Sequence, residues 1–387
     1  MRVAFYAPLK PPDHPVPSGD RRMARLLMAA LALGGHEVTV ASRLRSYEGS
    51  GEPARQRAIA GRGAARARAL IAGWLAAPPE GRPQAWLTYH LYHKAPDWLG
   101  PPVSRALGIP YLVAEASHAP KRAGGAWDLG HRAAAAAIAG ATLVLMLNPA
   151  DGECLLPLLE GPERLRRLPP FIDTAPYRRA RSVAPVARAA RRISLGLDVA
   201  TPLLLSVAMM RPGDKLASYR LLADALGRLA DRPWHVLLAG DGPARPDVEA
   251  AFARFDRRVT FLGALGEREL PGTYAAADLY AWPAINEAWG MTLLEAQASG
   301  LAVVAGAFGG VPAIVADGVT GLLTTPGDVG AFAAALGRLL DSPEERSRLG
   351  TAAAARMAAE HDIAAAARRL DAALSDALAM PRPAAAA

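Results

Sequence analysis

The sequence has one cysteine and lacks any apolar run long enough to span a membrane. Cys154 is the single cysteine among 387 residues, which excludes an internal disulfide framework. Residues 133–147 form the longest apolar run, which is shorter than a bilayer span and is better explained as a helix end that leads into a strand. Residues 1–9 lack the length and the cleavage site of a signal peptide. We therefore expect a cytoplasmic protein.

Motifs for metal and nucleic-acid binding are also missing. No D-x-D motif follows a predicted strand, and the pair His90 and His93 lacks neighbouring carboxylates, so we expect no metal site. Neither a recognition helix nor an array of stacking aromatics accompanies the net charge of +8, so nucleic acid is not an expected partner.

The positive charge is concentrated in the first half of the chain. Residues 1–192 carry a net charge of +13, whereas residues 193–387 carry −5. One interpretation is that the basic half meets an acidic glycan or an anionic membrane surface, which would make the protein peripheral on the inner face of the membrane. The other is compositional bias in a sequence rich in alanine, arginine and proline. Both remain open.

The strongest functional signal is a pair of carboxylates, Glu287 and Glu295, around the start of a predicted helix. Residues 277–283 resemble a buried strand ended by proline, and the apolar residues from 291 to 298 predict a helix closed by Gly300. A helix N-terminus at the carboxyl end of a strand is where an open α/β sheet binds anions. Carboxylates fit there if they accept hydrogen bonds from sugar hydroxyls beside a phosphate.

A longer series of motifs surrounds this pair. After Pro283 come Glu287-Ala288-Trp289-Gly290, Glu295, Gly300, a strand over 301–305, Gly309-Gly310-Val311-Pro312 and Asp317-Gly318-Val319-Thr320-Gly321. This order resembles the signature region of retaining glycosyltransferases of family 4. Earlier segments extend the resemblance: 209–215 resembles the family's G-R-L-x-P-x-K-G, 240–243 matches G-D-G-P, and 171–173 resembles the end of P-N-G-I-D.

The resemblance implies a GT-B fold of class α/β, in which two Rossmann-like domains face each other across a cleft and a C-terminal helix returns to the first domain. We expect an acceptor-side domain over 1–173 with the returning helix over about 360–380, a linker over 174–192 and a donor domain over 193–359. A length of 387 residues with 51% hydrophobic content is enough for two cores.

Alternating elements of the first domain fit a series of βαβ units. We expect a helix over 20–33 and a mobile loop or insertion over 49–63. Ser18-Gly19 stands where the family usually has two glycines, and one glycine still allows a phosphate to approach closely. Strands are expected at 3–7, 37–41, 85–89, 111–114 and 142–147, and the second domain is expected to open with strands at 203–207 and 235–239.

The resemblance also assigns roles to residues. A nucleotide-diphospho-sugar would lay its diphosphate against Arg211, Lys215 and the amides near Gly290, with its ribose near Glu295 and its transferred sugar near Glu287. Fixed cations and a helix N-terminus would stabilise the departing diphosphate, so we expect neither a metal nor another cofactor. The expected donor-binding residues are Gly19, Arg211, Lys215, Trp289, Gly290, Met291, Thr292 and Glu295.

The first domain offers a candidate catalytic histidine. Many family members have a histidine after the strand that is here 111–114, and His118 lies two positions beyond the usual place. We therefore name Glu287 and His118 as candidate catalytic residues, with Glu115 as an alternative to His118. His90 and His93 follow the strand at 85–89 and are further candidates.

The sequence thus predicts a retaining, metal-independent glycosyltransferase that moves a sugar to a glycan, a lipid-linked or a small-molecule acceptor. Two alternatives stay open: a nucleotide-sugar epimerase on the same fold, and a non-catalytic protein that binds a nucleotide sugar or a glycan. Ala116, Met210 and Ala313 depart from the residues usual in the family and keep the last alternative open.

Overall fold

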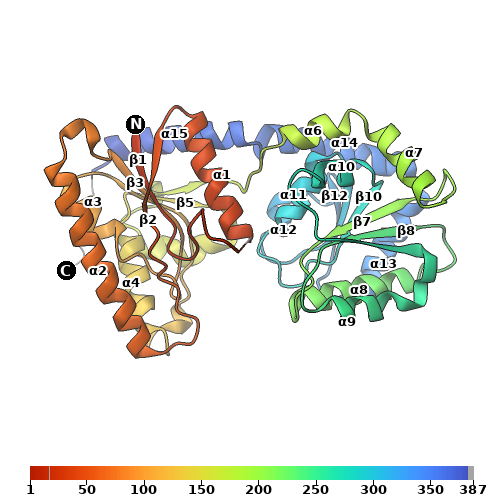
Figure 1. Cartoon of the computed structure of the whole chain (residues 1–387), viewed down its shortest axis with the longest axis horizontal. Coiled ribbons are helices and arrows are strands. Elements are labelled where there is room, and N and C mark those ends of the chain that lie inside the picture. The colour runs from red at the N-terminus through yellow and green to blue at the C-terminus, as the bar shows by residue number, and fades with distance from the viewer. Residues whose placement is uncertain (17, 382–387) are drawn as a thin grey trace. The chain divides into compact units, whose positions relative to one another are not determined.

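The computed structural model describes residues 1–16 and 18–381, and the chain divides into two compact units (Figure 1). Unit 1 consists of Met1–Pro169 together with Ile363–Ala387, and unit 2 is Pro170–Asp362. Each unit contains a parallel sheet of six strands with helices on both faces, which confirms the predicted α/β class.

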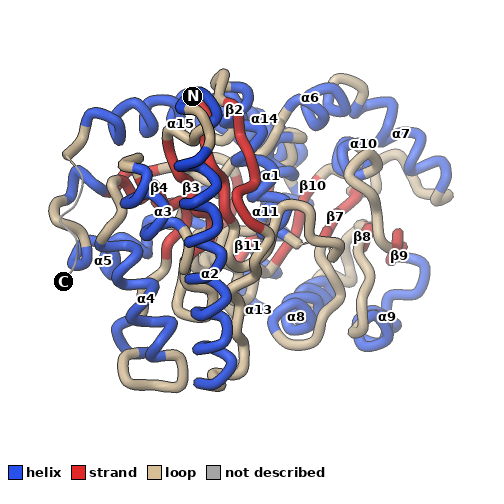
Figure 2. The backbone as a smooth tube through the Cα atoms, turned by 60° about the vertical axis from the view of Figure 1, so that its left-hand side comes forward, coloured by secondary structure: helices blue, strands red, loops and turns tan. Residues whose placement is uncertain are grey.

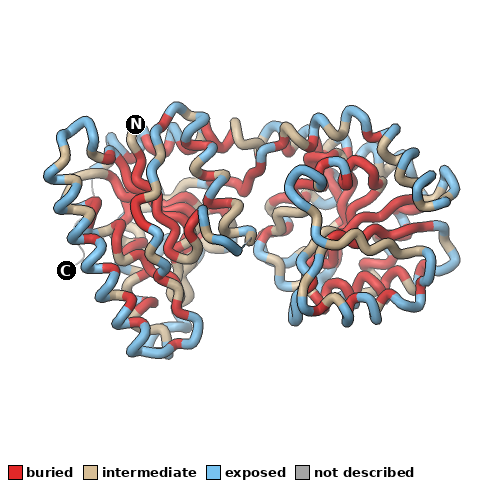
Figure 3. Tube along the Cα trace, viewed as in Figure 1, coloured by how far each residue is buried: buried red, intermediate tan, exposed pale blue. Residues whose placement is uncertain are grey.

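The sheet of unit 1 has the strand order β2-β1-β3-β4-β5-β6. Its central strands are buried on both faces, as expected for a parallel sheet covered by helices, and their sequences are accordingly near-continuous apolar runs (Figure 3). The strands are β1 (Arg2–Tyr6), β2 (Glu37–Ser42), β3 (Ala85–Leu91), β4 (Tyr111–Ala116), β5 (Leu143–Met146) and β6 (Leu165–Arg167).

Helices α1 and α15 pack together on one face of this sheet, and α2, α3 and α4 cover the other (Figure 2). Helix α15 buries Leu370 and Leu374, and Asp371 lies 3.2 Å from Nε2 of His36. The C-terminal helix therefore returns to the first unit, as predicted. The helices are α1 (Gly19–Leu33), α2 (Pro53–Ala76), α3 (Gly100–Leu107), α4 (Asp128–Ala139), α5 (Gly152–Leu155) and α15 (Ile363–Ala379).

The sheet of unit 2 has the order β12-β11-β10-β7-β8-β9. Its strands are β7 (Leu203–Val207), β8 (His235–Ala239), β9 (Val259–Gly263), β10 (Leu279–Trp282), β11 (Ala302–Gly306) and β12 (Gly321–Thr324). Its helices are α6 (Ala175–Arg181), α7 (Ala184–Ser194), α8 (Asp214–Gly227), α9 (Arg245–Phe252), α10 (Leu270–Ala275), α11 (Met291–Ala298), α12 (Val311–Ile314), α13 (Val329–Asp341) and α14 (Pro343–Glu360).

The expected mobile loop over 49–63 is wrong from residue 53 onward, because α2 begins there and continues to Ala76. Pro53 suits the first turn of a helix, and the alanines and arginines that follow are strong helix formers. One of the glycines that suggested a loop, Gly63, is required where α2 packs against Trp98. A Cβ on Gly63 would lie 2.4 Å from the Cβ of Trp98, so glycine lets α2 pack closely there.

Residues 174–192, expected to be a linker, are helical over most of their length and belong to unit 2. Helices α6 and α7 pack on α10. Arg188 and Arg192 form ion pairs with Asp278, which also accepts a hydrogen bond from the amide of Leu203 at 2.8 Å. Two of the six arginines of this segment thus attach it to the amino-terminal ends of the central strands β7 and β10.

No helix within residues 1–16 and 18–381 combines the length and the apolar character needed to cross a bilayer.

Candidate functional site

The strand order of unit 2 marks where a ligand should bind. From β7 the chain proceeds to β8 and β9 on one side, whereas β10, which lies directly beside β7, leads to β11 and β12 on the other. Ligands of open α/β sheets bind outside the carboxyl ends of the strands at such a switch point. The two loops there are 208–213, after β7, and 283–290, after β10.

Lys215 and Glu287 meet at this switch point. The Lys215 ammonium forms an ion pair with the Glu287 carboxylate and lies 5.3 Å from the ring centroid of Trp282. The indole N–H of Trp282 donates to the same carboxylate at 3.3 Å. Both charged side chains are only partly buried, at 28% and 17% exposed, so they remain accessible to a ligand.

The loop that carries Glu287 is strained and is fastened to α8. Ala284 and Asn286 have φ values of 56° and 51°, which are unusual for residues other than glycine. The amide of Ile285 donates to Ser218 at 3.1 Å, and the side-chain amide of Asn286 donates to Asp214 at 2.8 Å. Strain of this kind persists only where the surroundings enforce it, and it is common at ligand sites.

The glycines of the G-D-G-P turn hold the loop after β7 in place. A Cβ on Gly240 would lie 1.9 Å from the carbonyl oxygen of Ala208, and one on Gly242 would lie 2.4 Å from that of Met210. Only glycine allows this approach, which also matches their φ values of 145° and 151°. The turn therefore supports the loop that leads to Arg211 and Lys215.

The glycines of G-G-V-P support Glu287 in the same way. A Cβ on Gly309 would lie 2.5 Å from the carbonyl oxygen of Glu287, and one on Gly310 would lie 2.4 Å from that of Ala288. The Gly310 amide donates to the Ala288 carbonyl at 2.6 Å. These two motifs thus act through the backbone, by positioning the loops that carry the charged side chains.

The predicted donor residues at the start of α11 lie beside Glu287. Gly290 is the N-cap with a φ of 74°, and the helix begins at Met291, so the first amides of α11 have no partner within the helix. Met291 and Thr292 are half-buried, and Trp289 is buried. Arg211 is exposed in the loop after β7.

Glu295 lies deeper than expected. Its side chain is fully buried, and the hydroxyl of Tyr274 donates to its carboxylate at 2.7 Å. Burial, and next the charge of Glu295, raise the pKa of Tyr274 well above its usual value, so this hydroxyl stays a donor. The structure therefore joins Glu287 to Lys215, whereas it holds Glu295 against Tyr274.

Two of the predicted site residues, Gly19 and His118, lie in unit 1. Gly19 is the exposed first residue of α1, and a Cβ there would meet no atom within 4 Å, so packing within the chain does not require glycine. The His118 ring stacks on that of His131 with centroids 4.6 Å apart. Burial, and then the charge of His131, lower the pKa of His118, which favours the neutral ring.

A second group of titratable side chains lies at the carboxyl edge of the unit 1 sheet. The sequence named His90 and Glu115 as candidates but did not show that they lie close together. Nδ1 of His90 lies 3.1 Å from Asp20 and 3.7 Å from Glu115. Burial acts to lower the pKa of His90, but the charge of Glu115 and the hydrogen bond that the ring donates to Asp20 outweigh it and raise the pKa to about 9. Burial raises the pKa of Glu115 and that of Asp151 nearby.

No group of three or more histidine, cysteine or acidic side chains is arranged to hold a metal ion in the described part of the chain.

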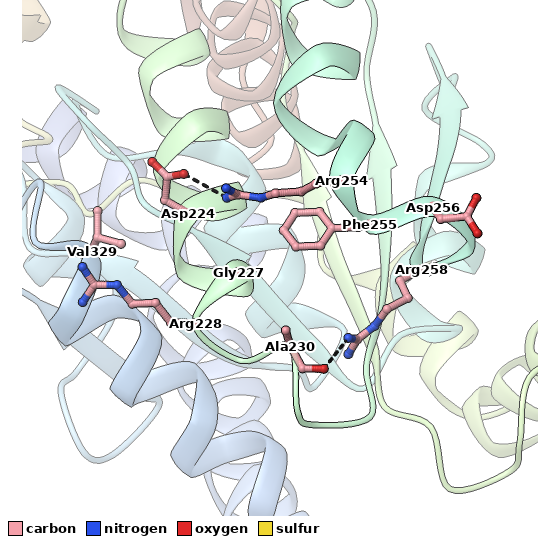
Figure 4. A pocket seen from close by; sticks show the side chains of 9 residues that line it. All are labelled: Asp224, Gly227, Arg228, Ala230, Arg254, Phe255, Asp256, Arg258 and Val329. Atoms are coloured by element: carbon pink, nitrogen blue, oxygen red, sulfur yellow. Dashed lines mark hydrogen bonds and ion pairs between the residues drawn. The ribbon is translucent and has the colours of Figure 1, made fainter.

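A cavity of about 650 Å³ lies at the other end of α8, away from Lys215 (Figure 4). It is rich in arginine, but two of its guanidinium groups are already engaged. Arg254 pairs with Asp224 at 2.9 Å, and Arg258 donates to the carbonyl of Ala230 at 2.9 Å. None of the predicted site residues lines this cavity.

Comparisons with known proteins bear on the identity of the chain. Residues 201–342 match the family model described as Glycosyl transferases group 1. A D-inositol 3-phosphate glycosyltransferase from Nocardia farcinica is 34% identical over 269 residues, which cover 66% of this chain and 52% of the relative. One from Mycobacterium sp. (strain KMS) is 37% identical over 207 residues, covering 52% and 43%. The chain spans about half the length of the curated relatives it matches.

Two solved structures share the fold over nearly the whole chain. Sucrose-phosphate synthase from Thermosynechococcus elongatus has a TM-score of 0.72 at 21% identity and covers 98% of this chain and 99% of its own. Anabaena Alr3699/HepE in complex with UDP and glucose has a TM-score of 0.68 at 19% identity and covers 97% and 99%. These matches agree with the resemblance indicated by the motifs: the chain has the GT-B fold, and residues 201–342 are similar to the group 1 glycosyl transferases.

Proposed function

We propose that this protein is a retaining glycosyltransferase that transfers a sugar from a nucleotide-diphospho-sugar to an acceptor hydroxyl without a metal ion. The observation that carries the proposal is the pairing of Lys215 with Glu287 at the switch point of unit 2, beside the N-terminus of α11. A cation, a helix N-terminus and a carboxylate at one sheet edge suit a ligand that has both phosphates and hydroxyls.

The ion pair suggests how donor binding prepares the site. A diphosphate would compete for the Lys215 ammonium, since phosphate carries more charge than the single carboxylate that now neutralises it. Lys215 and Arg211 would then hold the diphosphate together with the first amides of α11. Glu287, released from Lys215 but still held by the indole N–H of Trp282, would accept hydrogen bonds from the hydroxyls of the transferred sugar.

The catalytic contribution of these groups is electrostatic. Departure of the nucleoside diphosphate develops negative charge on a phosphate oxygen, and fixed donors stabilise that charge most strongly in the transition state. The strained loop and the glycine supports keep these groups in place before the substrate arrives, so little reorganisation accompanies the reaction.

Relatives suggest the first compounds to try. Solved structures of Alr3699/HepE contain UDP-glucose, and the curated relatives are named for D-inositol 3-phosphate. We propose a uridine or related nucleotide sugar as donor and a hydroxyl-bearing glycan, lipid-linked sugar or small molecule as acceptor.

The test is the substitution Glu287→Gln. We expect it to lower turnover roughly 10²- to 10³-fold, as the loss of one group that stabilises a transition state does, while the affinity for the free nucleoside diphosphate stays within a few-fold. Turnover is measured with a panel of nucleotide sugars, diphosphate binding by calorimetry, and retention from the anomeric configuration of the product by NMR.

The matched control is Glu345→Gln, which removes the same charge from the pair between Glu345 and Arg338 on the surface of unit 2. It should change neither turnover nor affinity. Wild-type turnover in Glu287→Gln would remove Glu287 from the site. An epimer that accumulates without acceptor would favour the epimerase, and binding without any turnover would favour a non-catalytic protein.

A further inference from the structure

Unit 1 has a switch point of its own, between β1 and β3. From β1 the chain proceeds through α1 to β2 on one side, whereas β3 leads to β4 and β5 on the other. The carboxyl end of β1 leads to α1, whose second residue is Asp20, and the carboxyl end of β3 carries His90. The same topological rule that points to Lys215 and Glu287 in unit 2 thus points to Asp20 and His90 in unit 1.

The side chains at this position form a connected group. Nδ1 of His90 lies 3.1 Å from Oδ1 of Asp20 and 3.7 Å from Oε1 of Glu115, and Oγ of Ser117 donates to Asp151 at 3.2 Å. The imidazole is 21% exposed and the Glu115 side chain 13%. Oε2 of Glu115 is buried, and Tyr89 acts on the same carboxyl group as a hydrogen-bonding neighbour.

The backbone at His90 and Glu115 is strained. Both residues have a φ of 60°, and they lie opposite each other on neighbouring strands, since Tyr89 pairs with Ala114 and Leu91 with Ala116. Two left-handed residues other than glycine at the same level of a sheet are costly for folding. The cost is understandable if the two side chains have a role in binding.

The charges around the imidazole define the kind of ligand. Three carboxyl groups, of Asp20, Glu115 and Asp151, act on the His90 imidazole, and Lys10 acts on Asp20, so carboxyl groups outnumber the cations around this ring. Carboxylate oxygens accept hydrogen bonds from hydroxyls, and an imidazolium N–H donates one. A phosphate placed here would be repelled by the carboxylates, whereas an uncharged ring with several hydroxyls would find both acceptors and a donor.

On the basis of the proposed function, we infer that His90 and Glu115 bind the acceptor as an uncharged, hydroxyl-bearing ring and that this site discriminates against phosphorylated acceptors. Asp20 acts as a positioning residue because its carboxylate orients the His90 ring. The acceptor class expected for this chain therefore differs from D-inositol 3-phosphate, the compound in the names of the relatives.

The experiment compares matched pairs of compounds on the 387-residue chain. Saturation-transfer NMR is recorded with myo-inositol against D-inositol 3-phosphate and with glucose against glucose 6-phosphate, and turnover of the donor panel is measured with the same four compounds. We expect the uncharged member of each pair to bind at least ten-fold more tightly and to be the better acceptor. Glu115→Gln should narrow this preference, because it removes negative charge while it keeps the shape of the side chain.

Two further variants complete the test. His90→Gln should weaken binding of the uncharged compounds at least ten-fold. Asp20→Asn should weaken their binding less, and it should also change the NMR resonances of the His90 imidazole. His36→Gln is the matched control, because it removes a histidine from a similar pair, with Asp371 at 3.2 Å, beside the start of β2 at the opposite edge of the sheet. It should leave binding unchanged.

Circular dichroism and calorimetry with the nucleoside diphosphate show whether each variant is folded, and Glu115→Gln or Asp20→Asn decides the question if His90→Gln does not fold. The inference is overturned if the phosphorylated compounds bind as well as the uncharged ones, if none of the four binds, or if the folded variants bind like the wild type. Binding of the uncharged rings without turnover of any donor would leave this site in place and contradict the glycosyltransferase proposal instead.

Discussion

Glu295 illustrates how a residue predicted from a motif acquires a different environment in the structure. The motif suggested that it accepts hydrogen bonds from a ribose, but the side chain is fully buried and accepts from Tyr274. Glu295→Gln should therefore destabilise unit 2 by about 1–3 kcal/mol, the range for a disrupted buried hydrogen bond. If Glu295 also reaches the nucleotide, nucleoside affinity falls as well.

The comparison with Tyr274→Phe separates these two roles. This variant removes the donor from Glu295 but leaves the carboxylate, so it should lower the melting temperature without weakening nucleoside binding. Thermal unfolding and calorimetry on both variants provide the measurements. Equal nucleoside affinity in wild type and Glu295→Gln would show that Glu295 supports the fold alone.

His90 makes a contribution to stability that depends on pH, and the direction of this dependence follows from the shift of its pKa. Its pKa is raised from 6.5 to about 9 in the folded protein, because the charge of Glu115 and the pairing with Asp20 outweigh the effect of burial. The stabilisation is complete below pH about 6.5 and is lost as the pH rises through about 9; its full size is roughly 3 kcal/mol. The difference in unfolding free energy between wild type and His90→Gln should shrink over that window.

His36 gives the opposite sign and serves as the control for this measurement. Burial, and next the charge of the N-terminus, lower the pKa of His36, so its contribution is lost as the pH falls instead. Denaturant unfolding at a series of pH values checks both variants. A His90→Gln difference that stays constant between pH 6 and pH 10 would contradict the charged pair of His90 and Asp20.

At the residue scale, the sequence named residues of the candidate site but not the contacts between them. Lys215, Glu287 and Gly290 could be named because the motifs fix their spacing along the chain. That Lys215 pairs with Glu287 follows only from the proximity of β7 and β10, which the order along the chain does not show. The sequence likewise named His90 and Glu115 as candidates but not their contact with Asp20, since the three residues come from three separate elements.

At the scale of elements, the glycines of the motifs determine where the loops lie. Gly309→Ala would place a Cβ 2.5 Å from the Glu287 carbonyl in a backbone with a φ of 53°. We expect turnover to fall roughly 10²-fold, as a displacement of about 1 Å at a catalytic group can cause. Gly327→Ala is the control: its φ of 82° imposes similar strain, but a Cβ there meets no atom within 4 Å.

Steady-state kinetics and thermal unfolding of both variants distinguish the two effects. Gly327→Ala should lose stability and keep turnover, whereas Gly309→Ala should lose both. Equal turnover in the two variants would mean that the contact between G-G-V-P and the Glu287 loop does not position the carboxylate.

The regular elements were predictable to different degrees. Buried parallel strands are short apolar runs, and those expected at 203–207 and 235–239 match β7 and β8. Helix α2 was missed because its glycines looked like loop residues, although a Cβ on Gly61 or Gly73 would meet no neighbour and only Gly63 packs against one. A packing contact with Trp98 cannot be recognised before the fold is known.

At the scale of the whole molecule, much of the positive charge of unit 1 lies on one exposed helix. Helix α2 contains five arginines and no acidic residue, and it is largely exposed along its length (Figure 3). Two arginines of α1 are engaged instead: Arg21 donates to the carbonyl of His14 at 2.9 Å and Arg25 to that of Pro12 at 2.7 Å. Variants that test the charge should therefore be made in α2, because changes in α1 would disturb its neighbouring loop.

If the arginines of α2 meet an anionic membrane, the chain should co-sediment with vesicles of anionic lipid at low salt but not with neutral vesicles. Binding should fall as the Debye length shortens from about 30 Å at 0.01 M salt to about 8 Å at 0.15 M. Reversing three exposed charges of α2, Arg57→Glu, Arg62→Glu and Arg68→Glu, should abolish vesicle binding without changing donor affinity.

The control makes the same change at exposed positions of unit 2, Arg228→Glu, Arg257→Glu and Arg268→Glu. It should leave vesicle binding largely intact, because residues 193–387 carry a net charge of −5. Equal loss in the two triple variants would mean that net charge alone governs association. If the chain binds neither kind of vesicle, the arginine excess is a property of composition. A basic surface that does not bind anionic lipid has no electrostatic role at a membrane.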